Sequence, residues 1–310
     1  MALEVLEPQP ILSAVSAEKK RLTFRSIVQS NSPLTVPGVY DGLSARVAAG
    51  MGAQAAYLTG YGVSASLLAR PDAGYLSLRD VADRTATLAP VLPIPLIVDA
   101  DTGFGGVINV MDTVRSLESA GAAAIQLEDQ VAPKRCGHTL GREVIDTGEM
   151  VRKIRAACDV RRDANLMIIA RTDARTTLGL DEACRRGEQY LEAGADVLFV
   201  ESPESADEFA LIGRRFAGAA LLANMVPGGR SPDLSAEELG EMGFSIILHP
   251  GAAMGPVVVA LKAAFGHLLK TGTSKGLPQW ALEPSELHGL NGFAEVWAQD
   301  LRYSAAEEEA

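Results

Sequence analysis

The chain has 310 residues, of which 47% are hydrophobic, and its formal net charge at pH 7 is -11. This length and composition fit a globular protein, and the acidic balance, with no basic stripe interleaved with aromatic residues, argues against nucleic acid as a partner. The N-terminus has no basic region followed by an apolar run, and Lys262 interrupts the longest late apolar stretch, so we expect neither export nor a membrane partner.

The first predicted element is a helix over residues 16–29, whose basic residues we expect on a solvated face. Eight short apolar runs follow, each separated from the next by a stretch long enough for a helix. These predicted strands cover residues 34–40, 55–59, 94–99, 123–128, 166–171, 196–201, 219–224 and 244–249. Eight strands alternating with helices predict an α/β fold, the (β/α)8 TIM-type barrel. We expect one domain over 1–310, with an N-terminal helical extension (about 1–33) and a C-terminal helical tail (about 271–310).

Glycine recurs shortly before predicted strands, at Gly52, Gly121, Gly194 and Gly243. A residue just past a helix end often takes a left-handed backbone, which glycine adopts without a side-chain penalty. The repeat therefore predicts helix, cap and strand in succession, and implies no chemistry.

Almost every predicted strand ends in a polar residue. These residues are Asp41, Thr59, Asp99 with Asp101, Glu128 with Asp129, Arg171 with Asp173, Glu201, Asn224 and His249. In a parallel barrel the carboxyl ends of the strands meet at one rim, so these side chains would surround one pocket. Polar residues also mark strand ends in general, but that would not explain so many acids opposite an arginine and an asparagine. For His249 we favour a rim position without a catalytic role.

The sequence Asp-Ala-Asp-Thr-Gly-Phe-Gly-Gly at 99–106 places two acids at alternate positions as the chain leaves a strand. Oxygen ligands of this kind suit Mg²⁺, which keeps several waters and needs few direct carboxylates. Asp99, Asp101, Asp72 and Glu128 are the candidate metal residues, and Mn²⁺ could replace Mg²⁺. No histidine or cysteine stands at zinc spacing among them. A salt-bridge network is the alternative reading of these acids.

The run Lys134-Arg135-Cys136-Gly137-His138 places a thiol among cations. Lys134 and His138 would favour a thiolate or a thiol that moves a proton, which makes Cys136 a candidate catalytic residue. The alternative is a small core cysteine. The other two cysteines, Cys158 and Cys184, fall in predicted helices, and the odd count favours a reduced, cytoplasmic protein without disulfides.

Five motifs resemble those of the isocitrate lyase and phosphoenolpyruvate mutase superfamily, from Tyr40 to about Ala253. They are Tyr-Asp-Gly-Leu-Ser-Ala-Arg at 40–46, Asp-Ala-Asp-Thr-Gly-Phe-Gly at 99–105, Leu-Glu-Asp-Gln at 127–130, Lys-Arg-Cys-Gly-His at 134–138 and Ala-Arg-Thr-Asp at 170–173. The cysteine motif is similar to that of the members that are carbon–carbon lyases acting on 2-hydroxy dicarboxylates.

The resemblance implies a role for each matching residue. Asp99 would ligate Mg²⁺ directly, and Asp72, Asp101 and Glu128 would hold its waters. Cys136 would move the proton, with Lys134 and His138 beside it, and Arg171 and Glu201 would complete the catalytic set. The residues implied in substrate binding are Tyr57, Thr59, Gly60, Tyr61, Asp99, Gly137, Arg171 and Asn224.

The continuation after the cysteine motif, Thr-Leu-Gly-Arg-Glu at 139–143, is closer to the 2,3-dimethylmalate lyase and petal death protein pattern than to methylisocitrate lyases. We therefore expect a Mg-dependent lyase that cleaves a 2-alkylmalate to pyruvate and a small carboxylate. Pro227 and His249 depart from the pattern of that group. Methylisocitrate lyase and oxaloacetate hydrolase or decarboxylase are the alternatives. Phosphonopyruvate mutase or hydrolase chemistry and a non-catalytic binding barrel rank lower. The family also implies a homotetramer with an exchanged C-terminal helix.

Overall fold

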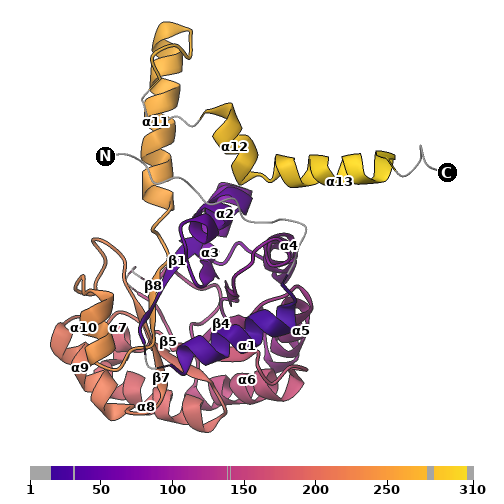
Figure 1. Ribbon diagram of the computed structural model, residues 1–310. Helices are drawn as coiled ribbons and strands as arrows, with labels where there is room; N and C mark the ends of the chain where they lie inside the picture. Colours follow the sequence, from indigo (N-terminus) through magenta and orange to yellow (C-terminus); the bar gives the residue numbers. More distant parts are fainter. Residues whose placement is uncertain (1–14, 31, 138, 140, 278–282, 306–310) are drawn as a thin grey trace.

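The structure is a computed structural model that describes residues 15–30, 32–137, 139, 141–277 and 283–305 (Figure 1). Eight parallel strands pair in chain order, and β1 pairs with β8 to close the barrel. The strands are β1 (Leu34–Val39), β2 (Ala56–Leu58), β3 (Leu96–Asp99), β4 (Ala124–Glu128), β5 (Met167–Thr172), β6 (Val197–Val200), β7 (Ala220–Asn224) and β8 (Ile246–His249). The predicted (β/α)8 barrel is confirmed, with every predicted strand in its expected place.

Helices surround the barrel, and three more follow the last strand (Figure 1). They are α1 (Ala17–Val28), α2 (Gly42–Gly50), α3 (Gly60–Val63), the π-helix η1 (Ser64–Leu68), α4 (Leu78–Leu88), α5 (Val107–Ser119), α6 (Thr147–Val160), α7 (Arg175–Leu178), α8 (Leu180–Glu192), α9 (Ala206–Arg215), α10 (Ala236–Glu241), α11 (Met254–Thr271), α12 (Pro284–Leu290) and α13 (Phe293–Ala305). Left-handed glycines, Gly52, Gly121, Gly194 and Gly243, lie between helix and strand with φ of 82°, 100°, 106° and 95°. The predicted caps are confirmed.

The barrel interior is filled by apolar side chains from several strands, among them Ile97, Ile169 and Leu222. Side chains two positions apart on a strand point the same way. The residues two positions further along these strands, Asp99, Arg171 and Asn224, therefore also point inward, at the carboxyl end of the barrel. Strand periodicity thus places an apolar core below and a polar layer above it.

Two of the basic residues of α1, Lys20 and Arg21, are buried with exposed fractions of 3% and 4%, so the expected solvated face is wrong for them, whereas Lys19 is exposed. Lys20 Nζ donates to the Ala89 carbonyl at 2.5 Å, just after α4. Arg21 donates to the carbonyls of Glu118 and Ala122 at 2.5 and 2.9 Å, around the end of α5. Cations satisfy the unpaired carbonyls of helix C-termini, which explains their burial.

The last three helices extend away from the barrel, with α11 leading outward and α13 projecting to the side (Figure 1). No side chain of α11, which the structure describes in full, is buried. Several apolar side chains of these helices are exposed, including Leu269 at 85% and Leu301 at 70%. Among the described helices, none has the length and apolar character needed to cross a bilayer.

Candidate active site

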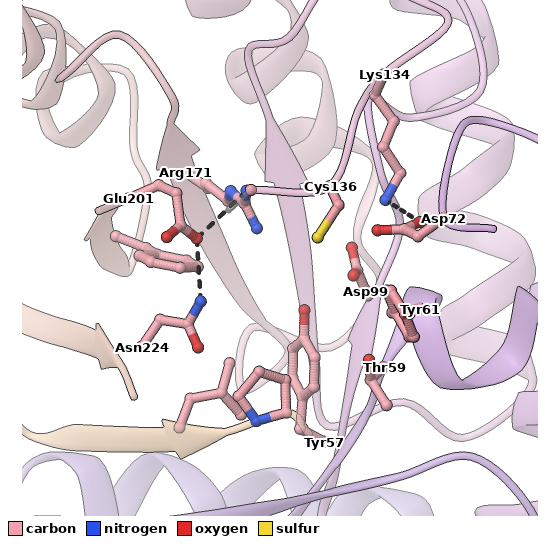
Figure 2. A pocket seen from close by; sticks show the side chains of 14 residues that line it. Tyr57, Thr59, Tyr61, Asp72, Asp99, Lys134, Cys136, Arg171, Glu201 and Asn224 are labelled. Atoms are coloured by element: carbon pink, nitrogen blue, oxygen red, sulfur yellow. Dashed lines mark hydrogen bonds and ion pairs between the residues drawn. The ribbon is translucent and has the colours of Figure 1, made fainter. Parts of the chain in front are cut away.

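A pocket opens at the carboxyl ends of the strands, as expected for a barrel enzyme. Figure 2 shows its lining side chains. They belong to Tyr57, Thr59, Tyr61, Asp72, Asp99, Lys134, Cys136, Gly137, Arg171, Phe199, Glu201, Asn224, Leu248 and Pro250. Residues that are far apart in the sequence thus meet around one cavity, as the strand ends predicted.

The remaining predicted site residues lie beside this lining. Gly60 donates its N–H to Asp99 Oδ2 at 3.3 Å. Asp101 and Glu128 contact the lining residues Lys134 and Arg171 from outside the cavity surface. His138 lies outside the described residues. His249, partly buried at the end of β8, does not line the pocket.

The Asp99 carboxylate is held by backbone and side-chain donors. Asp101 N–H donates to Oδ1 at 3.1 Å, and Gln126 Nε2 donates to the same oxygen at 3.3 Å. Gln126 also accepts a hydrogen bond from the Tyr57 hydroxyl at 3.1 Å. Burial, followed by the nearby Asp99 carboxylate, raises the pKa of Tyr57 well above its usual value. Tyr57 is therefore a neutral donor that fixes Gln126, and through it Asp99.

Lys134 lies between two acids from different loops. Its Nζ is 2.5 Å from Asp72 Oδ1 and 2.8 Å from Asp101 Oδ1, and its side chain is 5% exposed. Burial lowers the pKa of Lys134, but the surrounding carboxylates outweigh this effect and raise it well above the ordinary value. Burial raises the pKa of Asp101 to about 7, although Lys134 acts in the opposite direction. Lys134 is therefore a permanent cation at this edge of the pocket.

Three of the four acids expected at the metal site form ion pairs with side chains of the protein. Asp72 and Asp101 pair with Lys134, and Glu128 pairs with Arg171 at 3.4 Å, as the salt-bridge alternative expects. Among ion pairs between described residues, Asp99 takes part in none, and it faces the cavity. No group of three or more His, Cys, Asp or Glu side chains in the described part could hold a metal directly. The arrangement fits a hydrated Mg²⁺ with one direct carboxylate, Asp99.

Arg171 is a buried cation surrounded by carboxylates. Its Nη2 is 3.3 Å from Glu201 Oε2, and its guanidinium carbon lies 5.1 Å from the centre of the Phe199 ring. Burial lowers the pKa of Arg171, but the acids around it, Asp173 foremost, raise it well above the ordinary value. Asn224 Nδ2 donates to the same Glu201 oxygen at 3.1 Å. Arg171, Glu201 and Asn224 thus form one polar wall of the pocket.

Cys136 points into the pocket, between Arg171 and Asp99 (Figure 2). The Gln130 side chain holds the backbone just before Cys136, because Gln130 Oε1 accepts a hydrogen bond from Arg135 N–H at 3.0 Å. Gln130 Nε2 also donates to Glu128 Oε1 at 3.0 Å. Cys136, Arg171 and Asp99 therefore line the same pocket, as the sequence predicted.

Sequence reasoning missed several residues of this site, namely Gln126, Gln130, Phe199, Leu248 and Pro250. For two of them a signal existed. Phe199 precedes Glu201 by two positions, and Gln126 precedes Glu128 by two, so each shares a strand face with a predicted site residue. Pro250 follows the last strand, where no periodicity indicates direction.

Comparisons with known proteins agree with this geometry. The phosphoenolpyruvate phosphomutase family model matches residues 24–269. The 2,3-dimethylmalate lyase of Eubacterium barkeri is 43% identical and aligns over 91% of this chain and 97% of its own length. The 2-methylisocitrate lyase of Aeropyrum pernix is 40% identical, with 94% of each chain covered.

Solved structures are similar over the whole fold. Oxaloacetate acetylhydrolase in complex with 3,3-difluorooxalacetate superimposes with a TM-score of 0.88 at 35% identity, covering 94% of this chain and 98% of that one. Phosphonopyruvate hydrolase in complex with oxalate and Mg²⁺ superimposes with a TM-score of 0.83 at 30% identity, covering 92% and 99%.

Proposed function

Because the chain belongs to the PEP mutase/isocitrate lyase superfamily, we propose that its pocket cleaves a carbon–carbon bond of a 2-alkylmalate such as 2,3-dimethylmalate. The products are pyruvate and a small carboxylate. The observation that carries the proposal is that Cys136 and Arg171 meet Asp99 in one pocket. The names of its relatives support the class of enzyme, a carbon–carbon lyase.

The chemistry is a retro-aldol cleavage. The 2-hydroxyl group loses its proton, the C2–C3 bond breaks, and the oxygen at C2 becomes the ketone of pyruvate. The electron pair of the broken bond passes to C3, where the adjacent carboxylate stabilises it as an enolate. The Cys136 thiol then gives its proton to C3, which completes the second product. After the products leave, the thiolate regains from solvent the proton that the 2-hydroxyl group released. A partly enclosed site keeps water from this carbanion equivalent.

The residues around Cys136 contact different parts of the substrate. Arg171 stabilises negative charge that develops at the oxygen on C2, and Glu201 with Asn224 orients the second carboxylate and its surroundings. Mg²⁺, or Mn²⁺ in its place, held by Asp99 and through water by Asp72, Asp101 and Glu128, would supply further positive charge at the 2-oxo acid. Thr59, Gly60 and Tyr61 bind that end of the substrate, at the start of α3.

The test is pyruvate release, with Mg²⁺ or with chelator, from 2,3-dimethylmalate, 2-methylmalate and 2-methylisocitrate, with oxaloacetate followed by its own ultraviolet absorbance. We expect metal-dependent cleavage of an alkylmalate that collapses in Cys136→Ala. Faster turnover of 2-methylisocitrate or oxaloacetate would replace the substrate with one of the alternatives. Undiminished turnover in Cys136→Ala would overturn the proton donor. No turnover of any of these acids would overturn the lyase proposal and would favour phosphonopyruvate chemistry or a non-catalytic binding barrel.

We further propose that the enzyme is a cytoplasmic homotetramer in which a C-terminal helix is exchanged between subunits. The exposed apolar side chains of α11 and α13 support this assembly, because they lack cover from their own barrel. An apolar groove beside α2, lined by Leu43, Val47 and Val257, could receive such a helix. None of the three cysteines, all of which are described, forms a disulfide, in keeping with a reducing compartment.

A further inference from the structure

Ser202, directly after Glu201, is buried with 1% exposure and has a φ of 58°. This left-handed backbone is unfavourable for any residue with a Cβ and costs least for glycine. An observed backbone outlier beside an active site is a reason to look for a role of its side chain.

The Ser202 hydroxyl lies between two acceptors. Its Oγ is 3.2 Å from the Gly137 carbonyl oxygen and 2.9 Å from Glu201 Oε1. The other Glu201 oxygen, Oε2, already receives Asn224 Nδ2 and faces Arg171. A hydroxyl has one proton, so it is either shared or given to one of the two oxygens at a time. Ser202 therefore links the residue after Cys136 to the polar wall of the pocket.

Gly137 lies tightly against that wall. A Cβ on Gly137 would come within 2.4 Å of Arg171 Nη2 and 3.0 Å of Glu201 Oε2. A small displacement of Gly137 would therefore move Cys136 relative to Arg171. We name residues Lys134–Gly137 the cysteine segment, which Gln130 fixes at one end and Ser202 at the other.

We propose that Ser202 is a positioning residue that holds the cysteine segment against Arg171 and Glu201, so that the Cys136 thiol faces the reacting carbon. The inference rests on the proposed function for its catalytic consequence. The hydroxyl gives a reason for serine at a position whose backbone favours glycine, because glycine has no group to bond the Gly137 carbonyl.

The test compares Ser202→Gly, which relieves the backbone, with Ser202→Ala, which keeps the Cβ and removes only the hydroxyl. We expect iodoacetamide to alkylate Cys136 about three- to tenfold faster in both variants, the effect of losing one net hydrogen bond. Peptide mass spectrometry measures this rate without any substrate. We expect kcat for pyruvate release to fall by a similar factor with less change in KM, and Tm to be higher in Ser202→Gly than in Ser202→Ala.

Ser205→Ala is the matched control, because Ser205 caps α9 and its loss lowers stability without touching the cysteine segment. Its Cys136 alkylation rate should equal that of the wild type. A wild-type alkylation rate in Ser202→Gly would overturn the positioning role. Accelerated alkylation in both Ser202 variants of a protein that cleaves none of the acids would support the positioning role and overturn the proposed function.

Discussion

Arg171 and Asp173 form a buried two-point ion pair, with Nε 2.8 Å from Oδ2 and Nη2 2.9 Å from Oδ1. Asp173 also pairs with Arg142, whose side chain is fully buried and donates to Thr176. One carboxylate therefore orients the pocket arginine and also holds the chain that follows the cysteine motif. Burial opposes ionisation of Asp173, but the two arginines keep its pKa below the ordinary value.

Asp173→Asn should leave two buried guanidinium groups without their shared countercharge. Loss of one member of a buried pair typically costs about 3–5 kcal/mol. We expect a fall of that order in the free energy of unfolding, measured by urea denaturation, together with a loss of kcat/KM of at least about 100-fold. Asp83→Asn, in the exposed pair with Arg79, is the control and should change stability by about 0.5 kcal/mol or less. An active, stable Asp173→Asn protein would contradict the role of the ion pair.

Burial also raises the pKa of two of the cysteine thiols. It raises the pKa of Cys158 to about 11 and also raises the pKa of Cys184 above its ordinary value. A raised thiol pKa means that the protonated, unreactive form persists to higher pH. We expect the alkylation rate of Cys158 to rise with pH up to about 11, when followed by peptide mass spectrometry. A Cys158 rate that reaches its plateau near pH 8 would contradict this burial effect.

Removal of the cation should act through Asp99. We expect Asp99→Ala to lose Mn²⁺ binding in calorimetry and pyruvate release with any metal, because the remaining acids already pair with Lys134 or Arg171. Chelator should abolish pyruvate release by the wild type, and added Mg²⁺ should restore that activity. Exposed Asp83→Asn should bind Mn²⁺ as the wild type does. Undiminished Mn²⁺ binding by Asp99→Ala would place the direct ligand elsewhere.

The assembly prediction concerns the exposed apolar side chains of the last helices. Leu269→Glu combined with Leu301→Glu should lower the mass found by light scattering, since both side chains are open to solvent on their own subunit. The single-barrel fold should persist, with an unchanged circular dichroism spectrum. Exposed Lys262 or Lys270 changed to Ala should leave the mass as it is. A double variant with the wild-type mass would exclude these side chains from the interface.

The buried cations of α1 predict a cost that the sequence did not suggest. Arg21→Ala should remove the guanidinium donor from the carbonyls of Glu118 and Ala122 and lower the free energy of unfolding by about 1–3 kcal/mol. Lys19→Ala, at an exposed position two residues earlier in the same helix, should change the free energy of unfolding by no more than about 0.5 kcal/mol. Equal effects of the two changes in thermal unfolding would contradict the role of Arg21.

By itself, the sequence determined the eight strands, the glycine caps and the polar residues at the strand ends. Each of these is a local or periodic signal. A strand turns its side chains to alternate faces, and the barrel carries the ends of its strands to one rim, so Asp99, Arg171 and Asn224 could be assigned to one pocket before any contact was known.

Only the tertiary structure decided which side chains meet beyond the strands. The pairing of Lys134 with Asp72, the link from Ser202 to Gly137 and the burial of Arg21 join residues on different loops and helices. Loop side chains follow no periodic pattern of direction. From the sequence alone a charged side chain is expected to be solvated, because its partner far along the chain is not known. Strand periodicity predicted the direction of the acids and of the arginine. The folded loops decided which side chains balance their charges and which residues hold the thiol.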